Sequence, residues 1–170
     1  MIVFSLLYGI ISYGFSYYGE MVTYLGMTMP MSVFAFISWI KNPYNGNRAE
    51  TKINKLNICE FIFLFFITVI ITAIFYFILK KFNTANLLWS TFSVTTSFIA
   101  VYLTFRRSYY FALAYALNDI VLILLWILAS RTDIRYFSVI VCFITFLIND
   151  IYGFINWRKM HRRQKKLPGN

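Results

Sequence analysis

Residues 61–79 read FIFLFFITVIITAIFYFIL, an uncharged run bounded by Glu60 on one side and by Lys80 and Lys81 on the other. A helix of about 20 apolar residues is long enough to cross the ~30 Å hydrocarbon core of a bilayer. Over the whole chain, 60% of the 170 residues are hydrophobic and only 13% are charged, unlike the composition of a soluble domain. The sequence therefore predicts a polytopic, all-α integral membrane protein.

Further apolar runs lie on both sides of this one, separated by charged or turn-forming residues. They predict six transmembrane helices, at residues 1–18, 21–40, 58–80, 85–105, 109–129 and 135–157. The long connection at residues 41–57 contains the Pro, Gly, Asn and charges of a solvated loop. The opening MIVFSLLYGII has no basic n-region and no small-residue cleavage site, so no removable signal peptide is expected.

The basic residues divide unequally between the two sides of the predicted membrane. One side has Lys41, Arg48, Lys52, Lys55, Arg106, Arg107, Arg158, Lys159, Arg162, Arg163, Lys165 and Lys166, and the other has Lys80, Lys81, Arg131 and Arg135. The positive-inside rule places the long loop and the C-terminus in the cytoplasm. Because the net charge of +10 arises at helix ends, nucleic acid is not an expected partner. His161, within the basic tail, is expected to be solvated.

Two segments of the chain match at a constant offset. FAFISWIK (34–41) and YGFINWRK (152–159) share Phe, Ile, Trp and Lys 118 positions apart. Chance matches in aromatic-rich helices remain an alternative. A true duplication would make two parallel three-helix units joined by one helix, as in one repeat class of transporters. The chain then resembles this 3+1+3 architecture with its first helix missing.

Polar residues in the last three predicted helices align on helix faces at 100° per residue. On 85–105, a sector of about 60° holds Asn86, Ser90, Ser93, Ser97 and Thr104. A similar stripe on 135–157 holds Thr145, Asn149, Tyr152 and Asn156, and one face of 109–129 holds Tyr115, Asn118, Asp119 and Trp126. Such alignment predicts a shared polar cavity, whereas serines at small-xxx-small spacing also suit simple helix packing.

The acidic residues differ in their positions along the predicted helices. Asp119 lies in mid-span, where an acid costs ~2.5–3.5 kcal/mol to insert, so a cavity role is predicted, with a structural hydrogen bond between helices as the alternative. Asp150 lies nearer the helix end, so a cavity role and a surface ion pair with Arg158 or another basic side chain are equally open for it. Glu20 and Glu60 fall near helix starts, where a carboxylate favours the positive end of the helix dipole, and both are interpreted as structural.

Motifs for catalysis are not found. The chain has no Ser/His/Asp set, no metal-ligand spacing and no glycine-rich phosphate loop. Cys59 and Cys142 lie in separate apolar runs, which predicts neither a disulfide nor a metal site. The sequence therefore favours a transporter without a cofactor over an enzyme.

Three stretches together resemble the PnuC family of bacterial nicotinamide riboside transporters: NTANLLWSTFSVTTSFIAVYLTFRRS (83–108), YALNDIVLILLWILAS (115–130) and FLINDIYGFINWRKMHRRQ (146–164). The resemblance covers residues 36–166 and implies a full-length relative of the SWEET sugar transporters, with two parallel three-helix bundles. The implied activity is facilitated diffusion of nicotinamide riboside across the inner membrane, without an ion gradient. By motif, the substrate-lining positions correspond to Asn118, Trp126, Asn149, Tyr152 and Asn156. Asp119, Asn86 and Ser97 are weaker candidates.

These expectations define the domains and the hypotheses. Residues 1–40 are the two helices of a shortened first bundle, 41–57 a cytoplasmic loop, 58–82 the linker helix, 83–157 the second bundle and 158–170 a basic cytoplasmic tail. The leading hypothesis is a nicotinamide riboside transporter with alternating access in a bacterial inner membrane. Another vitamin or a sugar-like solute, and a truncated non-transporting subunit, are the alternatives. Lipid is an expected partner, and a homo-oligomer is left open.

Overall fold

The protein is described by a computed structural model over residues 1–15, 17–84, 86–131 and 133–166. Residue 85, at the start of the predicted fourth helix, and residues 167–170, at the end of the predicted tail, lie outside the described residues, as does the side chain of Arg48. The described elements are α1 (Ile2–Gly14), α2 (Tyr18–Thr23), a π-helical turn η1 (Tyr24–Thr28), α3 (Met29–Ile40), β1 (Pro43–Tyr44), β2 (Asn47–Thr51), α4 (Ile58–Lys81), α5 (Leu87–Phe105), α6 (Phe111–Ser130), a 3₁₀ turn η2 (Ile134–Tyr136) and α7 (Phe137–Lys166).

Five helical segments in the described chain are long and apolar enough to cross a membrane: Tyr18–Ile40, Ile58–Lys81, Leu87–Phe105, Phe111–Ser130 and Ile134–Lys166. The first helix is shorter than predicted. α1 has 13 residues and is therefore about 20 Å long, because the backbone leaves the helical region at Phe15 and Tyr17 before α2 begins. The prediction of a full span over 1–18 is wrong for this reason.

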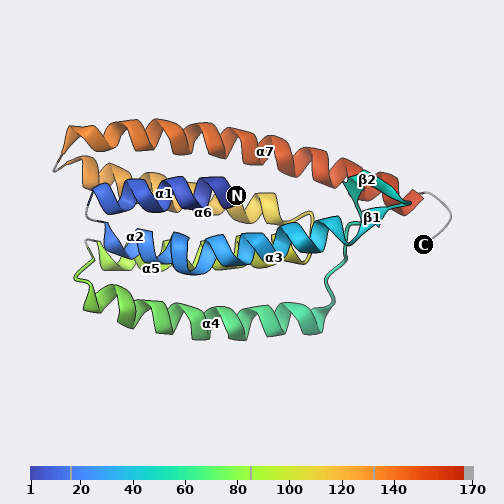
Figure 1. Ribbon diagram of the computed structural model, residues 1–170, viewed down its shortest axis with the longest axis horizontal. Coiled ribbons are helices and arrows are strands. Elements are labelled where there is room, and N and C mark those ends of the chain that lie inside the picture. The colour runs from blue at the N-terminus through green and yellow to red at the C-terminus, as the bar shows by residue number, and fades with distance from the viewer. Residues whose placement is uncertain (16, 85, 132, 167–170) are drawn as a thin grey trace.

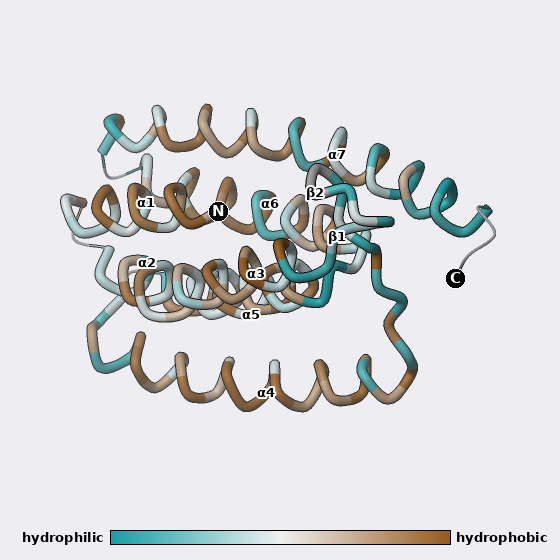
Figure 2. The backbone as a smooth tube through the Cα atoms, turned by 45° about the vertical axis from the view of Figure 1, so that its right-hand side comes forward, coloured by the Kyte–Doolittle hydropathy of each residue, from teal (hydrophilic) through white to brown (hydrophobic). Residues whose placement is uncertain are grey.

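The helices lie side by side along the long axis of the molecule, with α4 and α7 at opposite edges (Figure 1). α6 packs between α5 and α7, while α3 and α4 both pack against α5. Hydrophilic residues gather toward the hairpin and the C-terminal part of α7, and α4 is apolar over nearly its full length (Figure 2). An apolar surface along α4 is what a lipid-facing helix requires.

A π-helical turn interrupts the second long helical segment. Pro30 follows at the second position of α3 and has no N–H to donate to the carbonyl of Gly26, where its ring would also clash. The wider turn over Tyr24–Thr28 accommodates the missing hydrogen bond. Such π-helical turns are frequent at functional sites. This one directs the side chains of Tyr24 and Thr28 into the same cavity.

The connection at 41–57 is not simply a solvated loop. β1 and β2 form an antiparallel hairpin, in which Pro43 pairs with Thr51 and Tyr44 pairs with Asn47. Asn45 and Gly46 both have positive φ angles, 48° and 78°, as a two-residue hairpin turn needs. The Asn-Gly dipeptide is a strong hairpin signal that the loop interpretation overlooked.

α7 also differs from its prediction, because it continues to Lys166 instead of ending at 157. Gln164, near its C-terminus, is buried and donates to Glu50 and to the carbonyl of Thr51, at 2.8 and 3.1 Å. Its Oε1 accepts from Ile53 N at 3.0 Å, and Arg163 pairs with Glu50 at 2.6 Å. The tail therefore forms part of the folded structure, clasped by the hairpin.

Two pairs of residues 118 positions apart touch each other. Trp126 Nε1 donates to Tyr8 Oη at 2.8 Å, and the rings of Trp39 and Trp157 lie 4.9 Å apart. In a structure with two-fold symmetry, equivalent residues meet where they lie on the axis. The contacts support the repeat, but the 3+1+3 arrangement and its domain boundaries stay a prediction.

Candidate functional site

The candidate site is a cavity of about 210 Å³ between α1, η1, α5, α6 and α7. It opens to the surface at Met1, Phe146 and Asn149, which are exposed. It combines amide, carboxylate and hydroxyl groups with aromatic rings. Its lining residues are Met1, Phe4, Tyr24, Thr28, Ser97, Tyr115, Asn118, Asp119, Phe146, Asn149 and Asp150. Four of the predicted site residues thus meet in one place: Ser97, Asn118, Asp119 and Asn149.

Asn118 is the best-positioned of these groups. It is buried, and its Oδ1 accepts from Thr96 Oγ1 at 2.7 Å and from Ser97 Oγ at 2.9 Å. Its Nδ2 donates to Tyr24 Oη at 3.1 Å. Partners on both α5 and η1 therefore fix the orientation of the amide. Its second N–H group is held in one direction before any solute binds.

The cavity also holds two acids from neighbouring helices. Asp119 is 5% exposed, and its Oδ2 is buried without a hydrogen-bond partner among the described residues. Asp150, which was open to pairing with Arg158, is half-buried and lines the same cavity. The described lining contains no Lys or Arg. A buried carboxylate oxygen that lacks a partner is costly unless something binds it, so the cavity suits a solute with positive charge.

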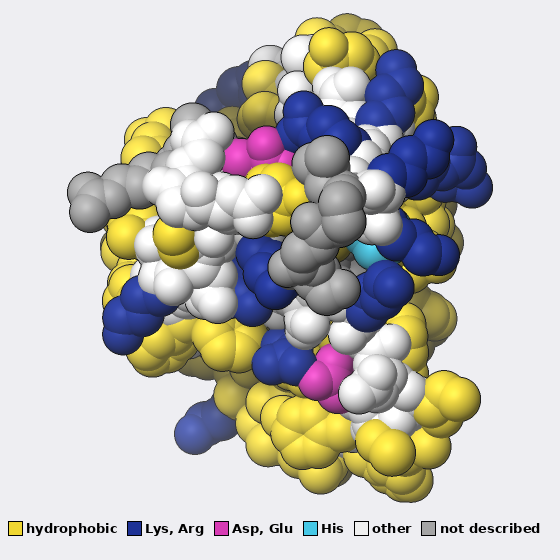
Figure 3. Space-filling model, turned by 90° about the vertical axis from the view of Figure 1, so that its right-hand side faces the viewer, with side chains coloured by type: hydrophobic (Ala, Val, Ile, Leu, Met, Phe, Trp, Pro, Cys, Tyr) yellow, Lys and Arg dark blue, Asp and Glu magenta, His cyan; other side chains and the backbone are white. Residues whose placement is uncertain are grey.

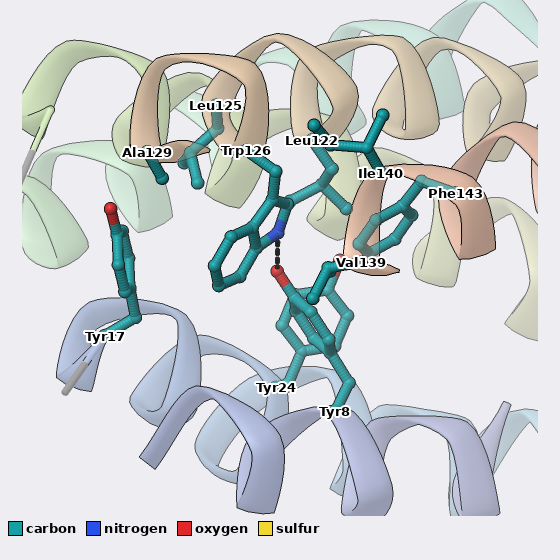
Figure 4. Packing of buried hydrophobic residues seen from close by; sticks show 10 residues of the cluster. All are labelled: Tyr8, Tyr17, Tyr24, Leu122, Leu125, Trp126, Ala129, Val139, Ile140 and Phe143. Atoms are coloured by element: carbon teal, nitrogen blue, oxygen red, sulfur yellow. Dashed lines mark hydrogen bonds between the residues drawn. The ribbon is translucent and has the colours of Figure 1, made fainter. Parts of the chain in front are cut away.

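Trp126 lies behind the cavity wall and not in it. Its side chain is fully buried among Tyr8, Tyr17 and Tyr136, with ring centroids 6.3, 4.8 and 5.4 Å away. Figure 4 shows the indole directed at Tyr8, to which it donates, with Tyr24 close by. We call Tyr8, Tyr17, Trp126 and Tyr136 the Trp126 layer. Trp126 lies about 12 Å along α6 from Asn118.

A second group of rings lies at the opposite end of the cavity. Trp157 packs against Trp39 at 4.9 Å and against Phe111 at 4.8 Å, and Trp39 Nε1 donates to the carbonyl of Thr104 at 2.8 Å. We call Trp39, Phe111 and Trp157 the Trp157 layer. Phe111 lies about 10 Å along α6 from Asn118, on the other side from Trp126. The cavity is therefore bracketed by two aromatic layers.

Three further predicted site residues, besides Trp126, are not brought to the cavity. Tyr152 is 66% exposed, and Asn156 is half-buried outside the cavity lining. Asn86 is exposed in left-handed conformation at the N-cap of α5. The stripe on α7 fails because only Asn149 of its four members faces the cavity, whereas Ser90, Ser93, Ser97 and Thr104 of the α5 stripe are all buried.

Several lining residues were not among the predicted site residues. Tyr115 belongs to the predicted polar face of α6 but not to the predicted site, and Tyr24 and Thr28 lie in the second predicted helix, outside the three predicted polar stripes. Glu20, Thr23, Tyr24 and Thr28 recur at helical spacing and are all buried, so a periodicity search of that segment would have found them. Phe4 and Phe146 carry no sequence signal that separates them from lipid-facing rings.

Glu20 lies outside the cavity lining, and its structural role stays a prediction, since its Oε1, like Asp119 Oδ2, is buried without a hydrogen-bond partner among the described residues. It lies in the first turn of α2, is 1% exposed, and accepts from Ser93 Oγ at 3.1 Å. Glu60, in the first turn of α4, forms an ion pair with Arg106. Among the described residues no group of three or more His, Cys, Asp or Glu side chains could hold a metal ion.

Comparisons with known proteins agree with this architecture. The family model described as "Nicotinamide mononucleotide transporter" matches residues 1–159. A relative named "Nicotinamide riboside transporter PnuC" from Neisseria mucosa is 28% identical over 162 residues, which cover 92% of this chain and 61% of the relative. The chain thus spans about three fifths of that protein.

A solved structure titled "Crystal structure of the Vitamin B3 transporter PnuC" matches with a TM-score of 0.78 and 24% identity, over 96% of this chain and 71% of that one. This likeness shows the same fold. The family match extends over nearly the whole sequence. The chain belongs to the nicotinamide mononucleotide transporter family.

Proposed function

We propose that this protein transports nicotinamide riboside across a bacterial inner membrane by facilitated diffusion. Support comes from its family and from the printed name of the Neisseria mucosa relative. The observation that carries the proposal is the cavity itself, where the fixed amide of Asn118 lies beside the unpartnered carboxylate oxygen of Asp119. An amide and a carboxylate together suit a solute with a carboxamide, hydroxyl groups and a positively charged ring.

The acids also distinguish the riboside from its phosphate ester. Nicotinamide mononucleotide carries a phosphate, whereas the riboside is a cation. A phosphate group calls for Lys or Arg, yet the described lining has Asp119 and Asp150 and no basic residue. With no Lys, Arg or His side chain in the described lining to neutralise it, a phosphate would be repelled by the carboxylate charge that this pair of acids carries. The electrostatics therefore favour the riboside.

Binding roles follow from the positions of the lining residues. Asn118, Asn149 and Ser97 are assigned to the carboxamide and the ribose hydroxyls, and Asp119 to the cationic ring. Tyr24 or Tyr115 supplies an aromatic face for that ring, in place of Trp126. The cavity volume of about 210 Å³ is below the ~300–1,000 Å³ of typical small-molecule sites, so the cavity has to widen as the solute enters.

The two aromatic layers are the proposed gates of an alternating-access cycle. Opening the Trp126 layer would connect the cavity to one side of the membrane, and opening the Trp157 layer would connect it to the other. Each layer contains a touching pair of residues 118 positions apart, as two gates built from parallel repeats would. The bias of basic residues assigns the Trp157 end to the cytoplasm.

A solute panel with the purified protein tests the substrate. Isothermal titration should detect binding of nicotinamide riboside, with at least ten times weaker binding of the mononucleotide and of uridine. The neutral reduced riboside serves as the charge control. Replacing Asp119→Asn should weaken binding of the cationic riboside and leave that of the reduced riboside nearly unchanged. Equal affinity for riboside and uridine would remove the substrate assignment and favour another vitamin or a sugar-like solute.

A further inference from the structure

A second polar cavity lies at the basic end of the molecule. Its volume is about 380 Å³, which is within the range of small-molecule sites. The lining residues are Asn54, Lys55, Leu56, Phe61, Ser108, Tyr109, Tyr110 and His161. None of them lines the central cavity, so the two spaces are distinct.

Three chain segments that are distant in sequence form the polar wall. The segment after the hairpin is joined to the α5–α6 turn, because Asn54 N donates to the carbonyl of Arg107 at 3.2 Å. In that turn Tyr110 N donates to the buried Ser108 Oγ at 3.4 Å. α7 closes the wall through His161, whose ring stacks on Tyr109 at 4.7 Å. His161 was expected to be solvated, but it is half-buried in this wall.

The electrostatic surroundings of this cavity are strongly positive. Lys and Arg side chains gather on the end of the molecule that carries the hairpin and the C-terminal part of α7 (Figure 3). Lys55 lines the wall. Burial, and after it the positive charges of Lys55 and Lys165, lower the pKa of the His161 imidazole. The two acids described at this end are already engaged, Glu50 by Arg163 and Glu60 by Arg106. Neither is part of the cavity lining.

We propose that this cavity is an anion site that binds a phosphate group. The ammonium of Lys55, the amide of Asn54, the imidazole of His161 and the hydroxyl groups of Ser108 and the tyrosines offer many donors, and no carboxylate in the described lining competes with a phosphate. Leu56 and Phe61 give the phosphate's organic substituent an apolar surface. The chemistry fits two sources, the headgroup of an acidic phospholipid and a soluble phosphate ester.

A ligand in this position would connect the hairpin segment, the α5–α6 turn and α7. Those elements are adjacent to the Trp157 layer. Phe111 is the first residue of α6, directly after the α5–α6 turn, and Trp157 lies four residues before His161 on α7. Binding should therefore hold the basic end together and raise the thermal stability of the protein. The inference does not depend on which solute the central cavity transports.

The experiment measures binding to the full-length protein in neutral detergent and in nanodiscs. The soluble probes are inorganic phosphate and adenosine monophosphate, followed by thermal shift, and the lipid probe is phosphatidylglycerol against phosphatidylcholine, followed by native mass spectrometry. The test variants are Lys55→Gln, which removes the charge, and His161→Phe, which keeps the stack on Tyr109 but removes the polar atoms. Lys159→Gln is the matched control, since Lys159 is exposed on α7 and does not line the cavity.

We expect at least one phosphate-bearing probe to bind, and Lys55→Gln and His161→Phe each to weaken binding by about tenfold, the worth of one charge-assisted hydrogen bond. Lys159→Gln should change it less than twofold. Binding of the soluble probes identifies a free phosphate ester, while binding of phosphatidylglycerol alone identifies the lipid headgroup. If no probe binds, or if all three variants lose affinity equally, the attraction is a general property of the basic surface and the site is refuted.

Discussion

Asn118 shows how a single polar residue can be maintained inside a membrane protein. Three hydroxyl groups from α5 and η1 engage its amide oxygen and one of its two N–H groups. The network is rigid because an alternative rotamer would leave buried hydroxyl groups without this partner. The same network holds Tyr24 Oη near Ser97 Oγ, at 3.3 Å. The orientation of the site therefore depends on this one side chain.

The substitution Asn118→Leu should remove the proposed contact with the solute. It should also remove the shared partner of the Thr96, Ser97 and Tyr24 hydroxyl groups. We expect the affinity for nicotinamide riboside to fall by about 1–3 kcal/mol, because a polar group of the buried solute would lose its partner. Isothermal titration checks the affinity, and size-exclusion chromatography verifies folding. Thr145→Val on the exposed side of α7 is the control, and should bind as the parent does. Unchanged binding by the Asn118 variant would mean that the solute lies elsewhere.

The Trp126–Tyr8 hydrogen bond can be tested by a double-mutant cycle. Tyr8→Phe and Trp126→Phe each remove the bond while keeping an aromatic ring, and each should lower the stability of the protein. Because both changes delete the same interaction, the double variant should lose less than the sum, with a coupling of about 0.5–1.5 kcal/mol. Thermal unfolding of the four proteins measures it. Strict additivity would show that the bond does not stabilise the layer.

At the scale of elements, the hairpin and the end of α7 form a clasp on the basic side. Glu50 accepts from Gln164 and pairs with Arg163, and these two interactions, the first being the larger, hold the pKa of the Glu50 carboxyl below its ordinary value. Gln164 also satisfies the carbonyl of Thr51, the last residue of β2, and the N–H of Ile53 just after it. A buried glutamine with this many partners fixes α7 against the hairpin.

The clasp should weaken in acid. The pKa of Glu50 is lower in the folded state, so its carboxylate stabilises the contact above the unfolded value of about 4.3, and this contribution disappears as the pH falls through the folded value. Hydrogen exchange of residues 47–53, corrected for the intrinsic pH effect, should show loss of protection as the pH falls below about 4.3. Glu50→Gln should abolish that dependence, whereas Asp133→Asn, at the opposite end, should leave it intact. A dependence that survives Glu50→Gln would assign the transition to another group.

At the scale of the whole molecule, a small polar cavity lies between two aromatic layers. The Trp126 layer and the Trp157 layer are separated along α6 by about 15 residues, or roughly 22 Å, and Asn118 lies near the midpoint.

Small residues permit the close helix approach that this arrangement requires. At Gly9, for example, a Cβ atom would come within 2.5 Å of Leu25 Cγ, so α1 can pack directly on η1.

Cross-linking one layer should block transport without blocking binding. In a background in which the exposed Cys59 and Cys142 are replaced by Ala, Trp39→Cys with Trp157→Cys would allow a short thiol reagent to join α3 to α7. We expect riboside uptake into proteoliposomes to fall below about one tenth, with recovery after cleavage of a reducible reagent, since alternating access requires both gates to move. The single Cys variants control for labelling alone. Full uptake by the cross-linked protein would exclude this layer as a gate.

Much of the fold was readable from residue order, because a helix in a membrane has to satisfy its own backbone and so needs an uninterrupted apolar run. α4, α5 and α6 appear within a few residues of their predicted positions. The buried serines of α5 were also predictable, since helical periodicity is a local property. The break after α1 and the hairpin at Asn45–Gly46 were missed where turn chemistry outweighed hydropathy.

The sequence did not determine which polar helix faces meet in the folded protein. Periodicity places a residue on a face of its helix but does not say which neighbour that face meets, so Asn149 reaches the cavity while Tyr152, on the same stripe, points away. The partners of Asn118 and Trp126 are 21 to 118 positions distant, and only packing of the helices brings them together. Apolar runs determined that this chain enters a membrane as helices, and tertiary contacts decided which polar groups share its interior.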